Sequence, residues 1–245
     1  MLSNIFNISL CIIAFLYTPY VLKELMQFLS DYKEHIKTSD YSESKESLVT
    51  DTLWNLIYNM LFLSAFLAQH SIMASSKVKA IWYKLHIGDA ERCIYNIASA
   101  AFLHILCKQW QPIPWFVLWD INTAKSTQLW LLFTLFQTLG WTIVYGGCLM
   151  MDVGELAGLK QIYYKLSNRP CPMTLKSDDL RRYYEHMRHP SFIGFLMVLW
   201  IHPFMTIDRC LIGLVLTFYM SIMWNIDDRD YYYHEFVIKR KLVEY

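Results

Sequence analysis

The sequence has few charged residues, few glycines and prolines, and no paired cysteine motif. Charged side chains make up 18% of the 245 residues, against about 25% in an average soluble domain. Eight glycines and seven prolines are too few for a loop-rich sheet protein. The lack of any Cys-x-x-Cys pair argues against a zinc site or a disulfide framework, so we expect no metal site. A formal charge of +1 gives no basic surface for nucleic acid, which we therefore exclude as a partner.

Hydrophobic residues account for 55% of the chain and aromatic residues for 16%, as is typical of a protein embedded in a lipid bilayer. Long uncharged runs recur along the chain, and about 20 helical residues cross the hydrocarbon core. We therefore predict an all-α, polytopic membrane helix bundle that forms a single membrane-embedded domain over residues 1–245. Its six transmembrane helices are expected at about 2–22, 53–74, 91–109, 126–151, 190–207 and 210–226. The last two should form a tight hairpin with Asp208 and Arg209 at its tip.

Basic residues are unevenly distributed between the two sides of this predicted bundle. Fifteen Lys and Arg residues fall on the side that carries both termini, and seven fall on the other side. Because basic loops stay on the cytosolic side, we expect both termini to face the cytosol or nucleoplasm. Residues 23–52 are then a polar lumenal loop, residues 152–189 a cytosolic or nucleoplasmic loop, and residues 227–245 a tail on that same side.

Polar residues at the ends of membrane helices are costly in lipid, so they are the first candidates for a functional site. His70, at the end of the second predicted helix, could bind a ligand or carry a proton. The commoner alternative is that it finishes the helix in the headgroup region.

A second polar group follows the fourth predicted helix and is expected to continue it. The spacing of Asp152 and Glu155 places both carboxylates on one helical face, and Gly158 lets another backbone approach closely. These carboxylates could hold ribose hydroxyls or a cation. They could equally pair with arginines in residues 181–188, because structural ion pairs resemble sites.

A third polar group lies at the start of the fifth predicted helix. Pro190 suits the first helical turn, so Arg188 and His189 should lie at the mouth of that helix. A helix N-terminus beside a guanidinium group is suited to bind a carboxylate or phosphate. The alternative is that these basic residues only mark the end of the helix in the headgroup region.

The run from Arg188 to Gly194 resembles the Arg-His-Pro-x-Tyr-x-Gly signature of isoprenylcysteine carboxyl methyltransferases and phospholipid methyltransferases, with Phe192 in the aromatic position. The chain as a whole resembles the nurim family, in the superfamily of NnrU-type proteins and methanethiol S-methyltransferases. Four further motifs carry this resemblance: Gln69–Ala74, Glu91–Tyr95, Trp110–Pro114 and Gly158–Gln161. The nurim family implies a six-helix, multi-pass membrane protein of the nuclear envelope.

The enzyme relatives imply S-adenosylmethionine as a cofactor. By this resemblance Arg188 would receive the carboxylate of the methyl donor, Asp227 or Asp228 would accept its ribose hydroxyls, and His189 would orient the group or shuttle a proton. Glu155 and His70 are the other catalytic candidates. The enzymes carry two adjacent glutamates where this chain has Asp227 and Asp228, and the shorter side chains weaken the case for methyl transfer.

Two functions follow from these observations. The first is a non-enzymatic multipass integral protein of the inner nuclear membrane, with the lipid bilayer and nuclear envelope or lamina proteins as partners. The alternative is an S-adenosylmethionine-dependent membrane methyltransferase that acts on a small thiol or a lipophilic acceptor. A transporter is disfavoured, because the ionisable residues gather at the predicted helix ends and not at mid-helix.

Overall fold

The computed structural model describes residues 2–30, 45–85, 87–150, 152–170 and 191–223, together with residues 232, 235 and 239. Its main helices are α1 (Leu2–Ser30), α2 (Lys45–Ala74), α4 (Glu91–Gln109), α5 (Thr127–Met150), α9 (Phe192–Trp200) and α10 (Ile207–Met223). Shorter elements are α3 (Ser76–Lys84), η2 (Gly88–Ala90), β1 (Val117–Asp120), η3 (Thr123–Lys125), α6 (Val153–Leu156), α7 (Leu159–Leu166) and β2 (Phe204–Thr206).

The chain is an all-α membrane helix bundle, as predicted. Among the described residues, three helices are long and apolar enough to cross a membrane: α1, α2 and α5, with mean hydropathies of 1.9, 1.3 and 1.3. Large apolar side chains on these helices point outward, including Leu16, Trp54, Leu61 and Leu135, each more than half exposed. Such a surface is unfavourable in water but suits a bilayer.

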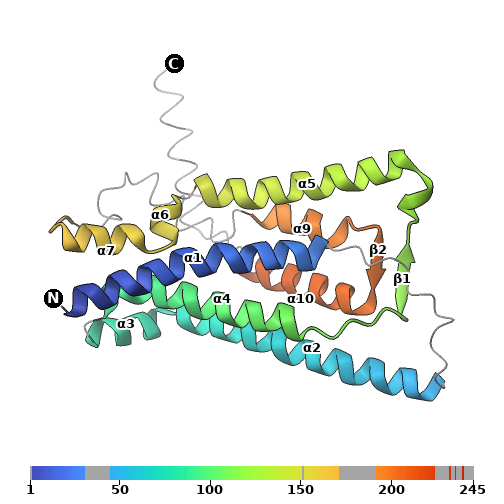
Figure 1. The fold of residues 1–245 in the computed structure, drawn as a ribbon, viewed down its shortest axis with the longest axis horizontal. Coiled ribbons are helices and arrows are strands. Elements are labelled where there is room, and N and C mark those ends of the chain that lie inside the picture. The colour runs from blue at the N-terminus through green and yellow to red at the C-terminus, as the bar shows by residue number, and fades with distance from the viewer. Residues whose placement is uncertain are drawn as a thin grey trace.

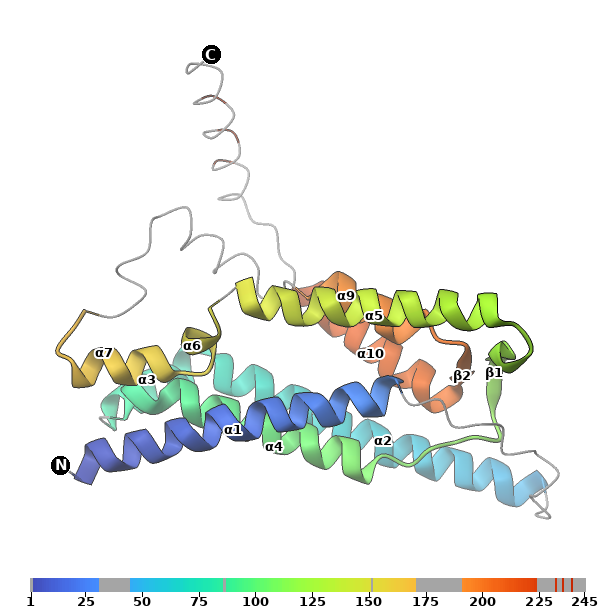
Figure 2. The same cartoon turned by 45° about the horizontal axis from the view of Figure 1, so that its top comes forward.

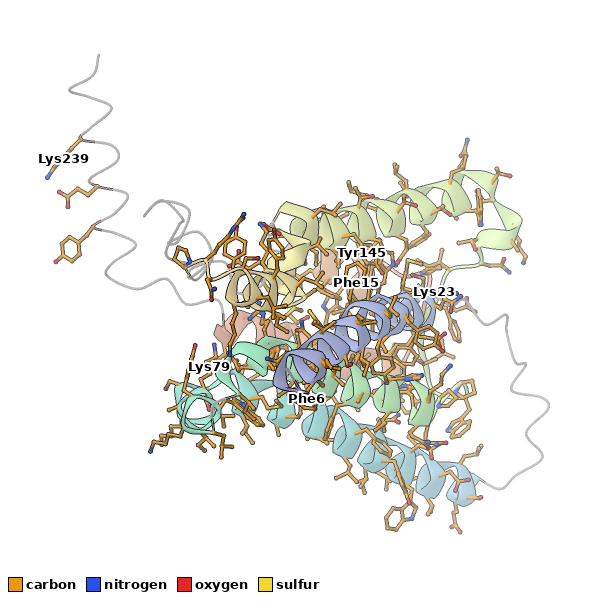
Figure 3. All side chains as sticks on the ribbon, turned by 60° about the vertical axis from the view of Figure 1, so that its left-hand side comes forward. Phe6, Phe15, Lys23, Lys79, Tyr145 and Lys239 are labelled. Carbon is orange, nitrogen blue, oxygen red and sulfur yellow. The ribbon has the colours of Figure 1, made fainter. Side chains whose placement is uncertain are left out.

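The bundle is elongated, with its helices roughly along one axis (Figure 1). Helix α4 lies between α1 and α2, while α9 packs against α5 and α10. Tyr145 on α5 donates a hydrogen bond to the carbonyl of Leu22 on α1 at 3.2 Å, which ties these groups together (Figure 3). The main core includes Leu63, Leu106 and Val198, all at most 1% exposed.

Close packing of α5 on α9 depends on two glycines. A Cβ atom on Gly194 would lie 2.6 Å from the carbonyl oxygen of Gly140, so no larger residue fits there without moving a backbone. The glycine of the Arg-His-Pro-x-Phe-x-Gly run therefore has a packing role, since it lets two helices approach as small residues do in membrane bundles.

Two bounds of the first helices differ from the sequence prediction. Helix α1 continues to Ser30 and α2 begins at Lys45, so much of the loop predicted at 23–52 is helical. The reason is an apolar stripe that continues past the first charge at Lys23: Val21 precedes this charge, Leu25 and Leu29 follow it at helical spacing, and all three are buried. The middle of that predicted loop lies outside the described residues.

The tight hairpin predicted at Asp208 and Arg209 was wrong. Helix α9 ends at Trp200, and the chain then forms β2, which pairs antiparallel with β1. Asp208 and Arg209 lie in the first turn of α10, which begins at Ile207. The nine residues of α9 rise only about 14 Å, well short of the hydrocarbon core.

The β1–β2 pair closes one end of the bundle, and α6, α7 and α3 lie at the other (Figure 2). We call these the strand end and the α6–α7 end. The strand end is reinforced by Trp119, whose indole N–H donates to the carbonyl of His202 at 2.9 Å. The loop predicted at 152–189 contains α6 and α7, and its part beyond residue 170 lies outside the described residues.

Candidate functional site

The first turns of α4 hold the connection between α5 and α7. Asn96 donates through Nδ2 to the carbonyl of Leu156 at 2.7 Å, and Arg92 donates through Nε to the same carbonyl at 3.3 Å. The thiol of Cys93 faces the carbonyl of Ala157 at 3.7 Å. One face of α4 therefore binds two consecutive carbonyls where α6 ends.

Gly158 allows this close approach, as the sequence predicted. Its φ of +86° lies in the left-handed region that favours glycine. A Cβ atom on Gly158 would lie 2.7 Å from Sγ of Cys93 and 3.2 Å from the backbone nitrogen of Cys93. The motif Gly158–Gln161 is thus matched to the motif Glu91–Tyr95, because residues from the two meet at this contact.

Asp152 is the N-cap of α6, and the prediction that it continues the fourth helix was wrong. Helix α5 ends at Met150, and Asp152 adopts a φ of +59°. Its carboxylate accepts from the backbone N–H of Glu155 at 3.3 Å and pairs with Lys160. That hydrogen bond and charge raise the pKa of Lys160. Of the two roles left open for this carboxylate, the structure shows ion pairing, with a lysine as the partner.

Glu155 is buried, with 6% of its surface exposed. The side chain of Gln161 donates to the Glu155 backbone carbonyl at 3.2 Å, which holds α6 against α7. A buried carboxylate at the end of a membrane helix is costly, so Glu155 stays a candidate for chemistry or for a structural ion pair.

His70 lies one turn before the end of α2 and faces α4 and α10. Its ring nitrogens lie 3.0 and 3.1 Å from the hydroxyl of Tyr95, and its ring meets that of Tyr219 edge-on. The hydroxyl of the next residue, Ser71, lies 3.0 Å from the hydroxyl of Tyr219. These contacts join three helices, which supports the structural interpretation of His70.

The four predicted cofactor-binding residues, Arg188, His189, Asp227 and Asp228, all lie outside the described residues. Their convergence with Glu155 stays a prediction. Among the residues that the structure describes, no cluster of three or more His, Cys, Asp or Glu side chains could hold a metal ion.

A second polar cluster, at the strand end, was missed as a site by the sequence reasoning. Asp208 is 3% exposed and accepts hydrogen bonds from Nε1 of Trp110 at 3.0 Å and from the backbone N–H of Ile113 at 3.3 Å. Asn59, which is fully buried, exchanges two hydrogen bonds with the backbone of Gln111 at 2.7 and 2.8 Å. Side chains of α2 and α10 therefore hold the motif Trp110–Pro114 in place through hydrogen bonds. The two prolines close to a tryptophan in this motif were the sequence feature that could have indicated the cluster.

His202 lies between α9 and β2 and is 2% exposed. Its Nδ1 lies 2.7 Å from the carbonyl oxygen of Phe204. Burial, followed by the nearby charge of Arg209, lowers the pKa of His202 to about 4, so the ring is neutral at neutral pH.

Comparison with known proteins finds relatives named nurim or nurim homolog. The chain is 38% identical over 229 residues to the nurim homolog of Drosophila pseudoobscura pseudoobscura. This aligned region covers 92% of this chain and 90% of the relative. It is 34% identical over 189 residues to nurim of Bos taurus and to nurim of Homo sapiens, covering 76% of this chain and 72% of each relative. No family model matches the chain, and no solved structure matches it significantly.

Proposed function

Because the chain belongs to the nurim family, we propose that it is a multipass integral protein of the inner nuclear membrane that acts through its membrane-embedded body and has no catalytic activity. Both termini face the cytosol or nucleoplasm in this proposal, and nuclear envelope or lamina proteins are the partners. The excess of basic residues on that side of the predicted bundle supports the orientation.

The observation that carries this proposal is the use of polar side chains as ties between helices. Asn96 and Arg92 bind one backbone carbonyl, His70 meets Tyr95, and Asp208 binds the segment after α4. Hydrogen bonds and close packing are what hold helices together in lipid, where the hydrophobic effect is weak. Side chains committed to such ties stabilise a rigid body that can be retained as a unit.

Retention of the tagged full chain in cells tests this proposal. We expect a fluorescent rim around the nucleus that persists after extraction with non-ionic detergent and recovers slowly after photobleaching. The variant Asp208→Ala loses the hydrogen bonds between α10 and the segment after α4, so it should disperse into the reticular membranes. The control variant Lys239→Ala removes only an exposed ion pair with Glu235 and should keep the rim.

Two results would contradict the proposal: a diffuse reticular distribution of the unchanged chain, or equal retention of intact Asp208→Ala protein. The second result would mean that a short segment, and not the folded body, provides the retention signal.

A second candidate function is an S-adenosylmethionine-dependent methyltransferase that acts on a small thiol or a lipophilic acceptor. The buried carboxylate of Glu155 favours it, because it lies at the end of the bundle to which the resemblance assigns the cofactor. Glu155 is the one buried carboxylate that the described residues supply there. It suits ribose hydroxyls or an ion pair, while Arg188, His189 and the Asp227–Asp228 pair would hold the rest of the cofactor.

When bound, S-adenosylmethionine would supply an electrophilic methyl group, and the chain's own residues would hold donor and acceptor in line. Calorimetry of the purified, folded protein tests this second candidate. Heat of binding that Glu155→Gln weakens would support it. The absence of heat at donor concentrations well above the micromolar range would rule it out.

A further inference from the structure

A cavity of about 350 Å³ lies at the strand end of the bundle. This volume falls within the range of about 300–1,000 Å³ that is typical of small-molecule sites. Residues of α1, α4, α9, β2, α10 and the segment after α4 form its wall. Most of that wall is apolar and includes Phe28, Trp110, Ile113, Leu199 and Ile212. The cavity lies at the opposite end of the bundle from α6 and α7, so it is separate from the site of the proposed methyl transfer (Figure 1).

The charged groups in this wall already have partners. Nζ of Lys108 pairs with the carboxylate of Glu24 at 2.5 Å. The guanidinium of Arg209 donates to the carbonyl of Leu29 at 2.6 Å and takes part in further interactions. The carboxylate of Asp208 accepts two N–H groups from the segment after α4. A charged ligand would therefore lose its hydration without meeting an unpaired opposite charge, so the cavity favours a neutral one.

One polar group in the wall has no partner among the residues that the structure describes. Thr206, at the end of β2, lines the cavity and is only 4% exposed, and its hydroxyl makes no hydrogen bond with any described residue. Leaving a buried hydroxyl unpaired is unfavourable. Because this side chain forms part of the cavity wall, a ligand oxygen in the cavity could pair with it. Thr206 therefore favours a neutral ligand that carries a hydroxyl or a carbonyl group.

The position of the cavity indicates a lipid. Its wall contains Phe28 and Leu29, which lie in the last turn of α1, at the end of a helix apolar enough to cross the bilayer. Lys108 lies in the last turn of α4, and its side chain is 57% exposed, as suits the headgroup level. The cavity therefore faces the boundary at which acyl chains join their headgroups.

We propose that this cavity binds a diacylglycerol, a neutral lipid whose headgroup is a single hydroxyl. Part of one acyl chain lies against Trp110, Ile113 and Ile212, and the glycerol hydroxyl or an ester carbonyl pairs with the hydroxyl of Thr206. The wall comes from several elements and is not flat, which suits a flexible chain better than a rigid ring system. The proposal requires only the membrane bundle, and it stands whether or not the chain is retained in the inner nuclear membrane or binds a methyl donor.

Photolabelling of the full chain tests this site. The protein is placed in phosphatidylcholine nanodiscs that contain a trace of diacylglycerol with a diazirine on one acyl chain, and labelled residues are mapped by mass spectrometry. We expect label on the residues that line the cavity, and unlabelled diacylglycerol should remove it. Phosphatidic acid with the same two chains should need about tenfold higher concentration, because its phosphate would be buried without an unpaired opposite charge.

Two pairs of variants separate binding from folding. Thr206→Val keeps the size of the side chain but removes its hydroxyl, so it should raise the diacylglycerol concentration needed for displacement about fivefold, the effect of one neutral hydrogen bond. Thr206→Ser should restore most of the affinity. Ile212→Phe fills the cavity and should abolish its labelling, whereas Leu214→Phe, on the exposed face of the same helix, should not change it. Each variant is first shown to elute as a single folded species.

Several results would overturn the proposal. They are label confined to the outward faces of α2 and α5, equal competition by phosphatidic acid or by cholesterol, unchanged competition in folded Thr206→Val protein, and unchanged cavity labelling in folded Ile212→Phe protein. Saturable cavity labelling that diacylglycerol displaces preferentially, Thr206→Val weakens and Ile212→Phe removes would establish the site.

Discussion

The two ends of the bundle both bury polar side chains, but they differ in the burial of the charged group that forms a tie: Arg92 is half-buried at the α6–α7 end, while Asp208 is 3% exposed at the strand end. At the α6–α7 end, donors on α4 such as Asn96 bind backbone carbonyls of a short connection. At the strand end, the buried carboxylate of Asp208 receives two N–H donors from the segment after α4. A buried charge costs more to leave without partners than a neutral amide does. Stability should therefore depend more on the strand end, while the α6–α7 end is held by weaker bonds.

The largest effect is expected from Asp208→Ala. This change leaves the indole N–H of Trp110 and the backbone N–H of Ile113 buried without their acceptor, at about 1–3 kcal/mol each. We expect the free energy of unfolding in mixed detergent micelles to fall by about 2–5 kcal/mol. Lys125→Ala, at an exposed position in η3, is the control and should change it by less than about 0.5 kcal/mol. Similar losses in the two variants would contradict the role of Asp208.

A smaller effect is expected at the other end from Gly158→Ala. The left-handed φ of +86° and the 2.7 Å approach to Sγ of Cys93 should together cost about 2 kcal/mol. Gly146→Ala is the matched control, because a Cβ atom there meets nothing within 4 Å. It should be neutral or stabilise α5 by about 0.5 kcal/mol. Thermal unfolding followed by size-exclusion chromatography should show a loss of stability for Gly158→Ala and none for Gly146→Ala.

The sequence predicted the helical membrane architecture because a long run of uncharged residues directly indicates a helix buried in lipid. It placed α4 at 91–109, where the structure has Glu91–Gln109. It also predicted that Gly158 permits a close backbone approach, since a missing side chain can be seen in the sequence. Those predictions depend on local composition, which a single chain shows.

What the sequence could not show were partners far apart along the chain. Asp208 was taken as a hairpin tip because a charge between two apolar runs usually lies at an interface. Its true partners, Trp110 and Ile113, lie about a hundred residues away, and their N–H groups make a buried carboxylate tolerable. The β1–β2 pair was missed for the same reason, since each strand has at most four residues and gains its hydrogen bonds only from the other.

The dependence of stability on pH sharpens the comparison further, because the pKa of His202 at the strand end is lowered to about 4. In the unfolded chain this residue takes up a proton near pH 6.5. Stability is therefore complete above about pH 6.5 and falls as the pH drops toward 4, by about 1 kcal/mol at pH 5.5.

This pH effect is measured by comparing unfolding midpoints at pH 7.5 and 5.5 in the unchanged chain and in His202→Gln. The variant removes the titrating group, so the difference between its two midpoints should shrink. A pH dependence identical to that of the unchanged chain would assign the effect to other groups.

The smallest effect is expected from Asn96→Ala at the α6–α7 end. Interhelical hydrogen bonds in membrane proteins contribute about 0.6 kcal/mol on average, and the carbonyl of Leu156 keeps Arg92 as a second donor. Global stability should hardly change, but hydrogen exchange of the backbone amides in α6 and α7 should speed up. Asn122→Ala, in the connection after β1, is the control and should leave that exchange unchanged. A loss as large as that of Asp208→Ala would show that the two ends contribute alike, because it would mean that a neutral amide tie stabilises the bundle as strongly as a buried carboxylate.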